Sequence, residues 1–457
     1  MTKLFSIDHL KATVAPGAKI LFANVPADGH FNPLTGIAVH LLKEGYDVRW
    51  YTSKRYAPKI EKLGIPTYPF ITAMDVDIEK ADILFPDREK HKSQIAKLNY
   101  DIINVFILRG PEYYTDIRAI HRSFPFDLLV ADITFGALPL VKEHMGIPAI
   151  GVGVIPIAET SKDLPPMGMG MLPAKTPLGR LKHAALRFIA DNVLFRRSNK
   201  VLKEVLAQYG IQPDGNMFDT IIRKSTLVLQ SGTPGFEYKR SDLGANIRFV
   251  GPLLPHQKVK SEKWFDARLM AYEKIILVTQ GTVEKDVEKL IVPTLQAFQN
   301  TDKLVIVTTG GSRTAELRER FAADNIIIED FIPFGDVMPY ANVYVTNGGY
   351  GGVLLSIQNG LPLVVGGVHE GKLEINARVE YFGLGVNLRT EKPVAEQVKR
   401  AVEEVISNGE YAQKVATLGH EFSQYNPARL CEQYIEQILV AKKESEITAA
   451  PQRALVV

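Results

Sequence analysis

Short apolar runs alternate with amphipathic stretches along most of the chain. The first run, residues 19–25, reads Lys-Ile-Leu-Phe-Ala-Asn-Val and predicts a buried strand. A helix is predicted next, with Asn32 as its N-cap and Pro33 in its first turn, because apolar residues follow at helical spacing. Gly45 ends that helix, and residues 47–53 predict a second strand. A strand, a helix and a strand in this order indicate a βαβ unit and therefore a parallel sheet.

The same alternation continues in two series. Further strands of the first series are predicted at 128–133, 149–154, 227–230 and 247–250. A second series of strands is predicted at 275–280, 304–309, 326–330, 343–346, 363–365 and 386–388, with helices at 286–299, 353–359, 374–382, 394–407 and 429–443. The pattern indicates an α/β protein with two Rossmann-like parallel-sheet domains facing each other across a cleft, since parallel sheets bind ligands beyond the carboxyl ends of their strands.

A polar, basic segment at 256–263 separates the two series. We expect an N-terminal domain over 1–250, a linker over 251–263 and a second domain over 264–425. Residues 426–457 are expected to form a helix that crosses back to the N-terminal domain, followed by a tail. The residues after Lys443 lack a clear apolar period, so we expect them to be loosely held.

Four glycines lie between the strand at 343–346 and the helix after it: Gly348, Gly349, Gly351 and Gly352. Glycines allow a sharp bend and leave room for a ligand to approach the backbone N–H groups. A helix N-terminus attracts anions, so a phosphate is the expected occupant. A tight turn with no ligand would explain the glycines equally well.

Charge and cysteine content exclude several classes of function. The formal net charge is only +3, which gives no reason to expect nucleic acid or an anionic membrane as a partner. Cys431 is the only cysteine, so an intrachain disulfide is impossible. Residues 1–18 lack the apolar core of a signal peptide, and no later stretch has the roughly 20 apolar residues needed to span a bilayer. We expect a cytoplasmic protein without stable membrane insertion; the oligomeric state is not indicated.

His30 lies in the loop after the first predicted strand, and Asp132 lies at the end of another predicted strand of the first series. If both strands belong to one parallel sheet, the two side chains lie at the same edge. Histidine titrates near neutral pH and can act as a general base, and a carboxylate beside it can fix its tautomer and stabilise its protonated form. A surface or packing histidine is the competing interpretation.

Two groups of acidic residues and histidines could be mistaken for metal sites. Asp75 and Asp77 have the spacing of a metal-binding pair, but no strand or glycine turn is predicted beside them. His369 and Glu370 have no second His or Cys at ligand spacing. We therefore predict no metal.

An irregular loop at 161–180 contains Met167, Met169 and Met171. Methionine side chains adapt to apolar ligands of varied shape, although they also fill gaps in a core. Both interpretations remain open for this loop.

Five segments in matching order resemble the family 1 nucleotide-sugar glycosyltransferases, the inverting enzymes of the GT-B fold. They are similar to the family's turn with the catalytic base, its Asp partner, its diphosphate loop, its nucleobase-stacking segment and its phosphate loop. In this chain they read Gly29-His30-Phe31-Asn32-Pro33, Ala131-Asp132, Gln280-Gly281-Thr282, residues 331–338 and Asn347-Gly348-Gly349-Tyr350-Gly351-Gly352. The similarity covers some 350 residues.

The resemblance implies that the domain at 1–250 binds the acceptor and the domain at 264–425 binds the nucleotide sugar. It also implies roles for particular residues. His30 and Asp132 are expected to be catalytic, and Phe31, Met167, Met169 and Met171 to contact the acceptor. The expected donor-binding residues are Gly281, Thr282, Phe331, Ile332, Asn347, Gly349, Gly351, Gly352, Glu370 and Lys372. Asn347 replaces the family's usual His, and Gly371-Lys372 replaces the Asp-Gln pair that reads the donor sugar, so the resemblance does not settle the donor.

The implied activity is an inverting, metal-independent transfer of a hexose, with glucose as the leading candidate, from a UDP-sugar. The acceptor would be a hydroxyl of an apolar small molecule such as a flavonoid, a polyketide or a sterol. No cofactor is expected beyond the UDP-sugar co-substrate, and TDP-sugars remain possible donors. A non-catalytic nucleotide-sugar-binding protein of the same fold and another GT-B activity, such as a sugar epimerase, are the alternatives.

Overall fold

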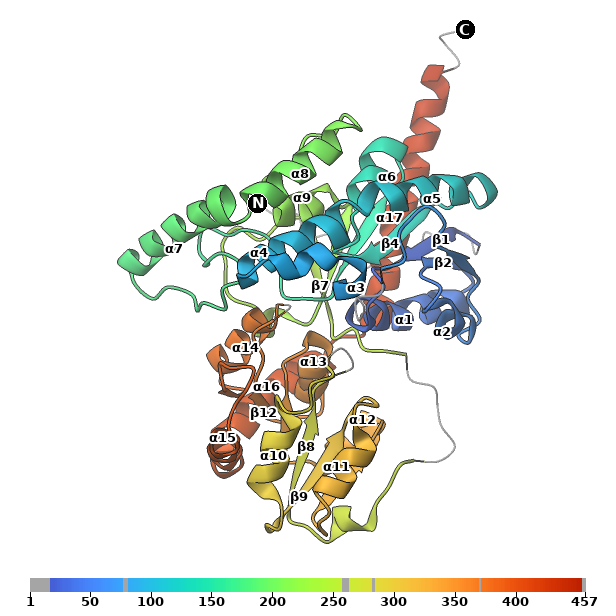
Figure 1. Ribbon diagram of the computed structural model, residues 1–457. Helices are drawn as coiled ribbons and strands as arrows, with labels where there is room; N and C mark the ends of the chain where they lie inside the picture. The colour runs from blue at the N-terminus through green and yellow to red at the C-terminus, as the bar shows by residue number, and fades with distance from the viewer. Residues whose placement is uncertain (1–16, 77–80, 257–262, 282–283, 370, 454–457) are drawn as a thin grey trace.

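The computed structural model describes residues 17–76, 81–256, 263–281, 284–369 and 371–453. Its strands form two parallel sheets, with helices on both faces of each (Figure 1). The first sheet contains β1 (Lys19–Ala23), β2 (Asp47–Thr52), β3 (Thr67–Pro69), β4 (Leu128–Asp132), β5 (Ala149–Gly153), β6 (Leu227–Ser231) and β7 (Ile247–Gly251). The second contains β8 (Lys274–Thr279), β9 (Lys303–Thr308), β10 (Ile326–Glu329), β11 (Val343–Thr346), β12 (Leu363–Val365) and β13 (Gly385–Asn387).

The helices of the first domain surround a sheet with strand order β3-β2-β1-β4-β5-β6-β7. They are α1 (Asp28–Lys43), α2 (Ala57–Glu61), α3 (Ala81–Leu84), α4 (Gln94–Asp101), the π-helix η4 (Ile102–Ile107), α5 (Gly110–Ser123), α6 (Leu138–Met145), α7 (Pro177–Ile189), the π-helix η5 (Ala190–Leu194), α8 (Arg196–Ala207) and α9 (Met217–Lys224). Two apolar cores cover its two faces, and β1 contributes alternate residues to each. The order places β1 beside β4, so the residues that follow these two strands emerge together.

The second sheet has the order β10-β9-β8-β11-β12-β13 and also packs two apolar cores. Its helices are α10 (Ile291–Phe298), α11 (Thr314–Arg320), α12 (Phe334–Val337), α13 (Tyr350–Gln358), α14 (Lys372–Tyr381), α15 (Ala395–Ser407) and α16 (Gly409–Ser423). In the first sheet, β2 and β4 lie on opposite sides of β1, and in the second, β9 and β11 lie on opposite sides of β8. The order in which strands are added therefore changes direction at β1 and at β8. Ligands of open α/β sheets bind at such switch points.

The last helix, α17 (Pro427–Arg453), leaves the second domain and packs on α1 and β7 of the first (Figure 1). Its residues Cys431, Ile435 and Leu439 are buried in the core that lines one face of the first sheet. Part of the predicted linker, residues 257–262, lies outside the described residues. In the described part of the chain, each helix is too short or too polar to cross a membrane.

Two local predictions are wrong. The first helix begins at Asp28 and not after Asn32. The N–H groups of His30 and Phe31 already donate to the carbonyl of Ala27. The Asp28 carboxylate, in the first turn, accepts a hydrogen bond from the Tyr56 hydroxyl. Asn32 and Pro33 therefore lie inside α1, although the dipeptide is typical of a helix start. The second concerns the end of the last helix, predicted at residue 443, since α17 continues to Arg453.

Candidate active site

Asp132 is the most fully bonded side chain at the carboxyl edge of the first sheet. It ends β4, is completely buried, and accepts four hydrogen bonds. Its Oδ2 accepts the N–H of Val25 at 2.8 Å, from the segment that follows β1. Its Oδ1 accepts from His30 Nδ1 at 2.9 Å, from the Thr134 N–H at 3.0 Å and from the Thr134 hydroxyl at 2.5 Å. The carboxylate is thus held rigidly and in turn orients the imidazole.

His30 lies in the first turn of α1, with its side chain 18 % exposed. An ionised carboxylate has no donor and can only accept hydrogen bonds. In a neutral imidazole, the contact with Asp132 therefore places the proton on Nδ1 and leaves a lone pair on Nε2. Within the described residues, Nε2 has no hydrogen-bond partner. The structure therefore leaves one basic nitrogen available at the edge of the sheet.

Phe31 does not lie where the sequence predicted an acceptor contact. Its side chain is only 4 % exposed and packs between Trp50 and Tyr56 in the core, with ring centroids 5.4 and 4.9 Å away. The physical reason is that α1 begins early, because neighbouring residues of a helix point about 100° apart. With His30 facing the edge of the sheet, Phe31 is turned inward.

Phe106 is an aromatic neighbour of His30 that the sequence did not indicate. Their ring centroids lie 6.5 Å apart. Phe106 belongs to the π-helix η4, and π-helical turns are frequent at functional sites. Gly136, after β4, lies so close that an added Cβ would be 2.8 Å from the Phe106 carbonyl oxygen. This close approach brings η4 to the edge that carries His30 and Asp132.

The glycines after β11 fall into two groups. Gly348 is required by the fold itself, because its φ is +85° and a Cβ there would lie 1.8 Å from Asn376 Oδ1. The fold does not require a glycine at position 349 or 351. A Cβ at Gly349 would meet its nearest atom at 3.9 Å, and a Cβ at Gly351 would meet nothing within 4 Å. Their lack of side chains leaves open space beside the backbone.

That open space faces the start of α13, which has Gly349 as its N-cap with ordinary negative φ. The first N–H groups of a helix have no partner within the helix, and its dipole makes this end positive. Helix α13 also contacts α1, the helix that carries His30. An anion at this end of α13 would lie in the second domain, close to the helix that carries the candidate base.

The loop after β8 lies beside the glycine turn. Gly281 has a φ of +75°, and Asn347 Nδ2 donates to the carbonyl of Gln280. The Gln280 side chain accepts from the N–H groups of Leu290 and Ile291 at the start of α10, so it is structural. Thr282, the predicted diphosphate contact, lies outside the described residues.

The predicted nucleobase contacts differ in exposure. Phe331, after β10, is 69 % exposed and available for stacking, whereas Ile332 is buried in the core of the second domain. Only the backbone of Ile332 could therefore contact a ligand.

The predicted sugar contacts lie at the start of α14. Lys372 is its first residue, and its alkyl chain runs beside Gly367, where an added Cβ would lie 3.0 Å from Lys372 Cδ. Glu370 lies outside the described residues. Glu391 accepts the N–H groups of Val368 and His369, both at 3.2 Å. Glu391 therefore orders the segment that leads to Lys372.

The groups considered as metal ligands have other partners. His369 Nε2 lies 3.0 Å from Glu391, and Asp75 accepts the N–H of Lys54. Asp77 and Glu370 are outside the described residues. Among the residues that the structure describes, no three His, Cys, Asp or Glu side chains converge.

The methionine loop of the first domain is bonded to the second domain. Glu374 of α14 accepts the N–H groups of Gly168 and Gly170 through Oε1, at 2.9 and 2.8 Å. Its Oε2 lies 3.2 Å from Nη1 of Arg378, which also pairs with Glu237 of the first domain. Burial alone would lower the pKa of Arg378, but the two carboxylates raise it above its ordinary value. This interdomain clasp, Glu237–Arg378–Glu374, fixes the loop that contains Met167, Met169 and Met171.

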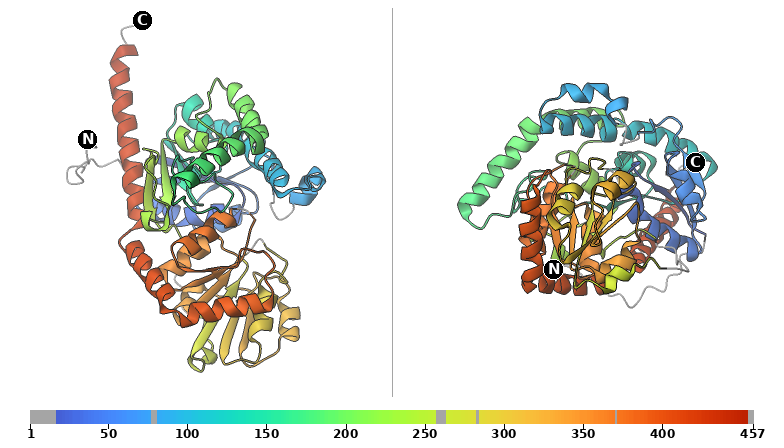
Figure 2. Two further views of the ribbon diagram at one scale, coloured as in Figure 1. Left: turned by 90° about the vertical axis from the view of Figure 1, so that its left-hand side faces the viewer. Right: turned by 60° about the horizontal axis from the view of Figure 1, so that its bottom comes forward.

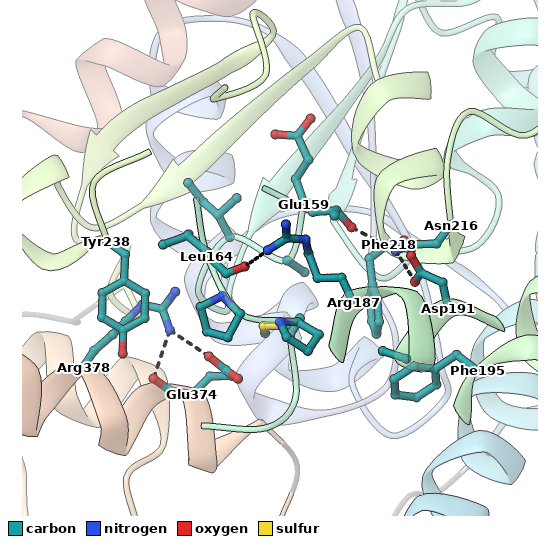
Figure 3. Close-up of a pocket in the computed structure, with 17 residues that line it drawn as sticks. Glu159, Leu164, Arg187, Asp191, Phe195, Asn216, Phe218, Tyr238, Glu374 and Arg378 are labelled. Carbon is teal, nitrogen blue, oxygen red and sulfur yellow. Dashed lines mark hydrogen bonds and ion pairs between the residues drawn. The ribbon is translucent and has the colours of Figure 1, made fainter. Parts of the chain in front are cut away.

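A cavity of about 40 Å³ lies under this loop, between the first domain and α14 (Figure 3). Met167, Arg187 and Arg378 are among the side chains that line it. Burial raises the pKa of Asp191 at its far end, opposed by a hydrogen bond from Asn216. His30 and the glycine turn are not part of its lining. Met169 and Met171 are half-buried and do not line it either, so the cavity is separate from the candidate catalytic pair.

Comparison with known proteins agrees with this geometry. Residues 293–437 match the family described as erythromycin biosynthesis protein CIII-like, C-terminal domain. The chain is 33 % identical to 4'-demethylrebeccamycin synthase of Lentzea aerocolonigenes over 411 residues, which cover 89 % of this chain and 96 % of that protein. It is 30 % identical to UDP-glucosyltransferase 1 of Beauveria bassiana over 425 residues, covering 87 % and 90 %.

Solved structures show the same fold. The glycosyltransferase of kitacinnamycin superposes with a TM-score of 0.73 at 18 % identity, covering 93 % of this chain and all of that one. The calicheamicin glycosyltransferase CalG4 superposes with a TM-score of 0.71 at 22 % identity, covering 93 % and 99 %. Two parallel-sheet domains of the GT-B type are thus confirmed. The chain belongs to the family 1 nucleotide-sugar glycosyltransferases and is a glycosyltransferase of the natural-product type.

Proposed function

We propose that this enzyme transfers a hexose, with glucose as the first candidate, from a UDP-sugar to a hydroxyl of an apolar small molecule, with inversion and without a metal. The observation that supports it is the contact between His30 and Asp132, which leaves Nε2 as a base at the edge of the first sheet. Relatives named UDP-glucosyltransferase support UDP-glucose as donor. Two solved neighbours with TM-scores of 0.63 and 0.65 are complexes with dTDP and thymidine diphosphate, so a TDP-sugar is the second candidate.

In this mechanism the acceptor hydroxyl gives its proton to Nε2 of His30 while its oxygen attacks the anomeric carbon. The bond from that carbon to the diphosphate oxygen breaks on the opposite face, which inverts the configuration. Asp132 stabilises the imidazolium as it forms. The departing nucleoside diphosphate carries the negative charge, and the N–H groups at the start of α13 stabilise it.

The donor and acceptor contacts complete the proposal. Phe331 stacks on the base, and Gly281, Thr282 and Asn347 line the diphosphate. Glu370 and Lys372 face the sugar. The acceptor lies against the first domain within reach of His30, and it contacts the loop that contains Met167, Met169 and Met171 from outside the cavity under that loop.

The test is a mass-spectrometric screen of a mixed phenol and polyketide library against UDP-glucose, UDP-glucuronate, UDP-N-acetylglucosamine and TDP-sugars. A product mass identifies donor sugar and acceptor together, and retained activity in a chelator supports metal independence. His30→Ala is expected to lower kcat by about 10² to 10⁴ while donor binding persists.

His40 provides the matched control for this test, because it lies on the same helix but pairs with Glu432 of α17. His40→Ala should retain transfer. Full activity of the His30 variant, or equal loss in both variants, would contradict the assigned base. Sugar turnover without any acceptor would favour an epimerase.

A further inference from the structure

Helix α7 presents an apolar face that the rest of the described chain does not cover. Its exposed apolar side chains recur at helical spacing: Leu178 is 76 % exposed, Leu181 67 % and Phe188 67 %. The helix stands out from the body of the first domain (Figures 1 and 2). Large apolar side chains gathered on one exposed face usually mark an interaction surface.

The patch continues beyond α7. Val193, in the π-helix η5, is 65 % exposed, and Ile95 of the neighbouring α4 is 41 % exposed. Asn99 brings these two helices together, because its Nδ2 donates to the carbonyls of both Ile95 and Leu194, at 3.0 and 2.7 Å. The exposed apolar residues therefore extend over two adjacent helices.

Basic residues surround this apolar face. Arg180 and Lys182 lie on α7 at either side of the stripe of Leu178, Leu181 and Phe188, since residues of a helix are 100° apart. Both side chains are exposed, and no carboxylate among the described residues lies within ion-pair distance of either. Their charges are therefore available to an external partner.

The charge of the whole chain conceals this local excess. Residues 172–207 contain eight Lys and Arg against two Asp and Glu, whereas the remainder has 46 basic and 49 acidic residues. All of the chain's net positive charge therefore lies in this segment. Four of these eight basic residues lie on α8, and the exposed basic side chains of α7 itself are Arg180 and Lys182.

We propose that the face formed by α7, η5 and α4 binds the surface of a bilayer that contains anionic lipids. Helices with Leu and Phe on one face and Lys and Arg beside it lie in the bilayer interface, with the apolar face among the acyl chains. The charge complementarity selects anionic headgroups. The helix is peripheral and does not cross the membrane. Binding there would hold the enzyme at the surface where apolar small molecules accumulate.

The test is co-sedimentation of the full-length protein with vesicles of phosphatidylcholine, with and without phosphatidylglycerol. The wild type should sediment only with the anionic vesicles. Arg180→Gln combined with Lys182→Gln should weaken binding on the order of 20- to 30-fold, since each basic side chain near an anionic surface contributes about fivefold. Leu181→Asp combined with Phe188→Asp should abolish it.

Matched controls come from the second domain. Met270 is 73 % exposed and Arg400 71 %, so Met270→Asp and Arg400→Gln change similar groups away from the patch. Both should sediment as the wild type does, and circular dichroism should be the same for all variants. Failure to bind anionic vesicles, or binding that the α7 variants do not weaken, would overturn the proposal. A second result would also overturn it: a wild-type dimer in sedimentation velocity that becomes a monomer when Leu181→Asp is combined with Phe188→Asp. The partner of this face would then be a second copy of the chain.

Discussion

The carboxyl edges of the two sheets carry different kinds of chemistry. At the first edge, side chains bond one another: Asp132 accepts four hydrogen bonds, one of them from His30. At the second, backbone groups and empty space dominate, and Gly349 and Gly351 lack any close neighbour that would explain them. The difference teaches that side-chain hydrogen bonds fix the proposed base in place, whereas the proposed anion site consists of backbone groups beside open space.

The largest effect is expected from Asp132→Asn at the preformed edge. An asparagine keeps the shape but cannot stabilise the imidazolium, and the comparable change in a Ser-His-Asp triad costs about 10⁴ in kcat. We expect a loss of up to about that size in steady-state transfer assays, with donor affinity unchanged.

Asp116 is the matched carboxylate for that experiment. It is also buried, and it accepts from the Tyr51 hydroxyl and from the N–H groups of residues 71–73, away from His30. Asp116→Asn should lower the melting temperature while the active fraction keeps its kcat. Equal kinetic losses in both variants would mean that the first edge is not a specialised site.

The next effect is expected at the second edge. Gly349→Val places a side chain in the space beside the α13 N–H groups, and loss of one hydrogen bond to a charged group costs about 10- to 100-fold in affinity. Titration calorimetry with UDP measures this loss, and circular dichroism should show an intact fold.

Gly348→Ala separates the two groups of glycines. Because a Cβ at 348 collides with Asn376, this variant should be destabilised or misfolded. If Gly349→Val binds UDP as the wild type does, the open space has no ligand and the turn is only structural.

A smaller effect is expected where the two domains meet. Glu374→Gln keeps the size of the side chain but weakens its bonds to Gly168, Gly170 and Arg378. We expect the acceptor KM to rise about tenfold, the range of one charge-assisted hydrogen bond, with the donor KM nearly unchanged. Glu380→Gln on the same helix, which pairs outward with Arg389, should leave both constants unaltered. A parallel rise in both KM values would show that the clasp does not act through the methionine loop.

The smallest effect concerns pH. Burial alone would raise the pKa of Glu391, but Lys289, the N–H of Val368 and His369 lower it below its ordinary value. In the unfolded chain the pKa of this carboxyl is near 4.5, and in the folded protein it is lower. The ionised Glu391 therefore stabilises the fold fully above pH 4.5, and this stabilisation is lost as the pH falls through the pKa of the folded protein. Glu391→Gln should lower the free energy of unfolding by about 1 kcal/mol at pH 7 and by less at pH 4. Denaturant unfolding at both pH values measures the difference; a constant cost would contradict it.

Much of the fold could be predicted because buried parallel strands are continuous apolar runs. Twelve strands of the two sheets lie within a residue or two of their predictions. Strand β3 was missed, since it has three residues and lies at an edge. His30 and Asp132 could be paired from the sequence because each follows a strand. Their catalytic roles remain predictions.

The rest depends on packing that has no local pattern. Phe106 reaches His30 through a π-helix, and no sequence motif marks such a turn. Tyr350 was visible only as part of a glycine motif, yet its hydroxyl donates to the carbonyl of Ser231 in the other domain at 2.8 Å. Glu374 likewise acquires its partners only when the domains meet. The wrong start of α1 shows that Asn-Pro is a weaker determinant than the tertiary contacts of Asp28.

Helix α17 has a consequence for biosynthesis. Cys431, Ile435 and Leu439 belong to the core of the first domain, although the whole second domain precedes them in the chain. Domains generally fold as units during translation, the N-terminal one first. Here the first domain to leave the ribosome cannot complete its core until the second domain and α17 have been synthesised. Until then its unfilled apolar surface is exposed to chaperones, and a chain truncated before α17 would carry both cores of the second domain beside an incomplete first domain.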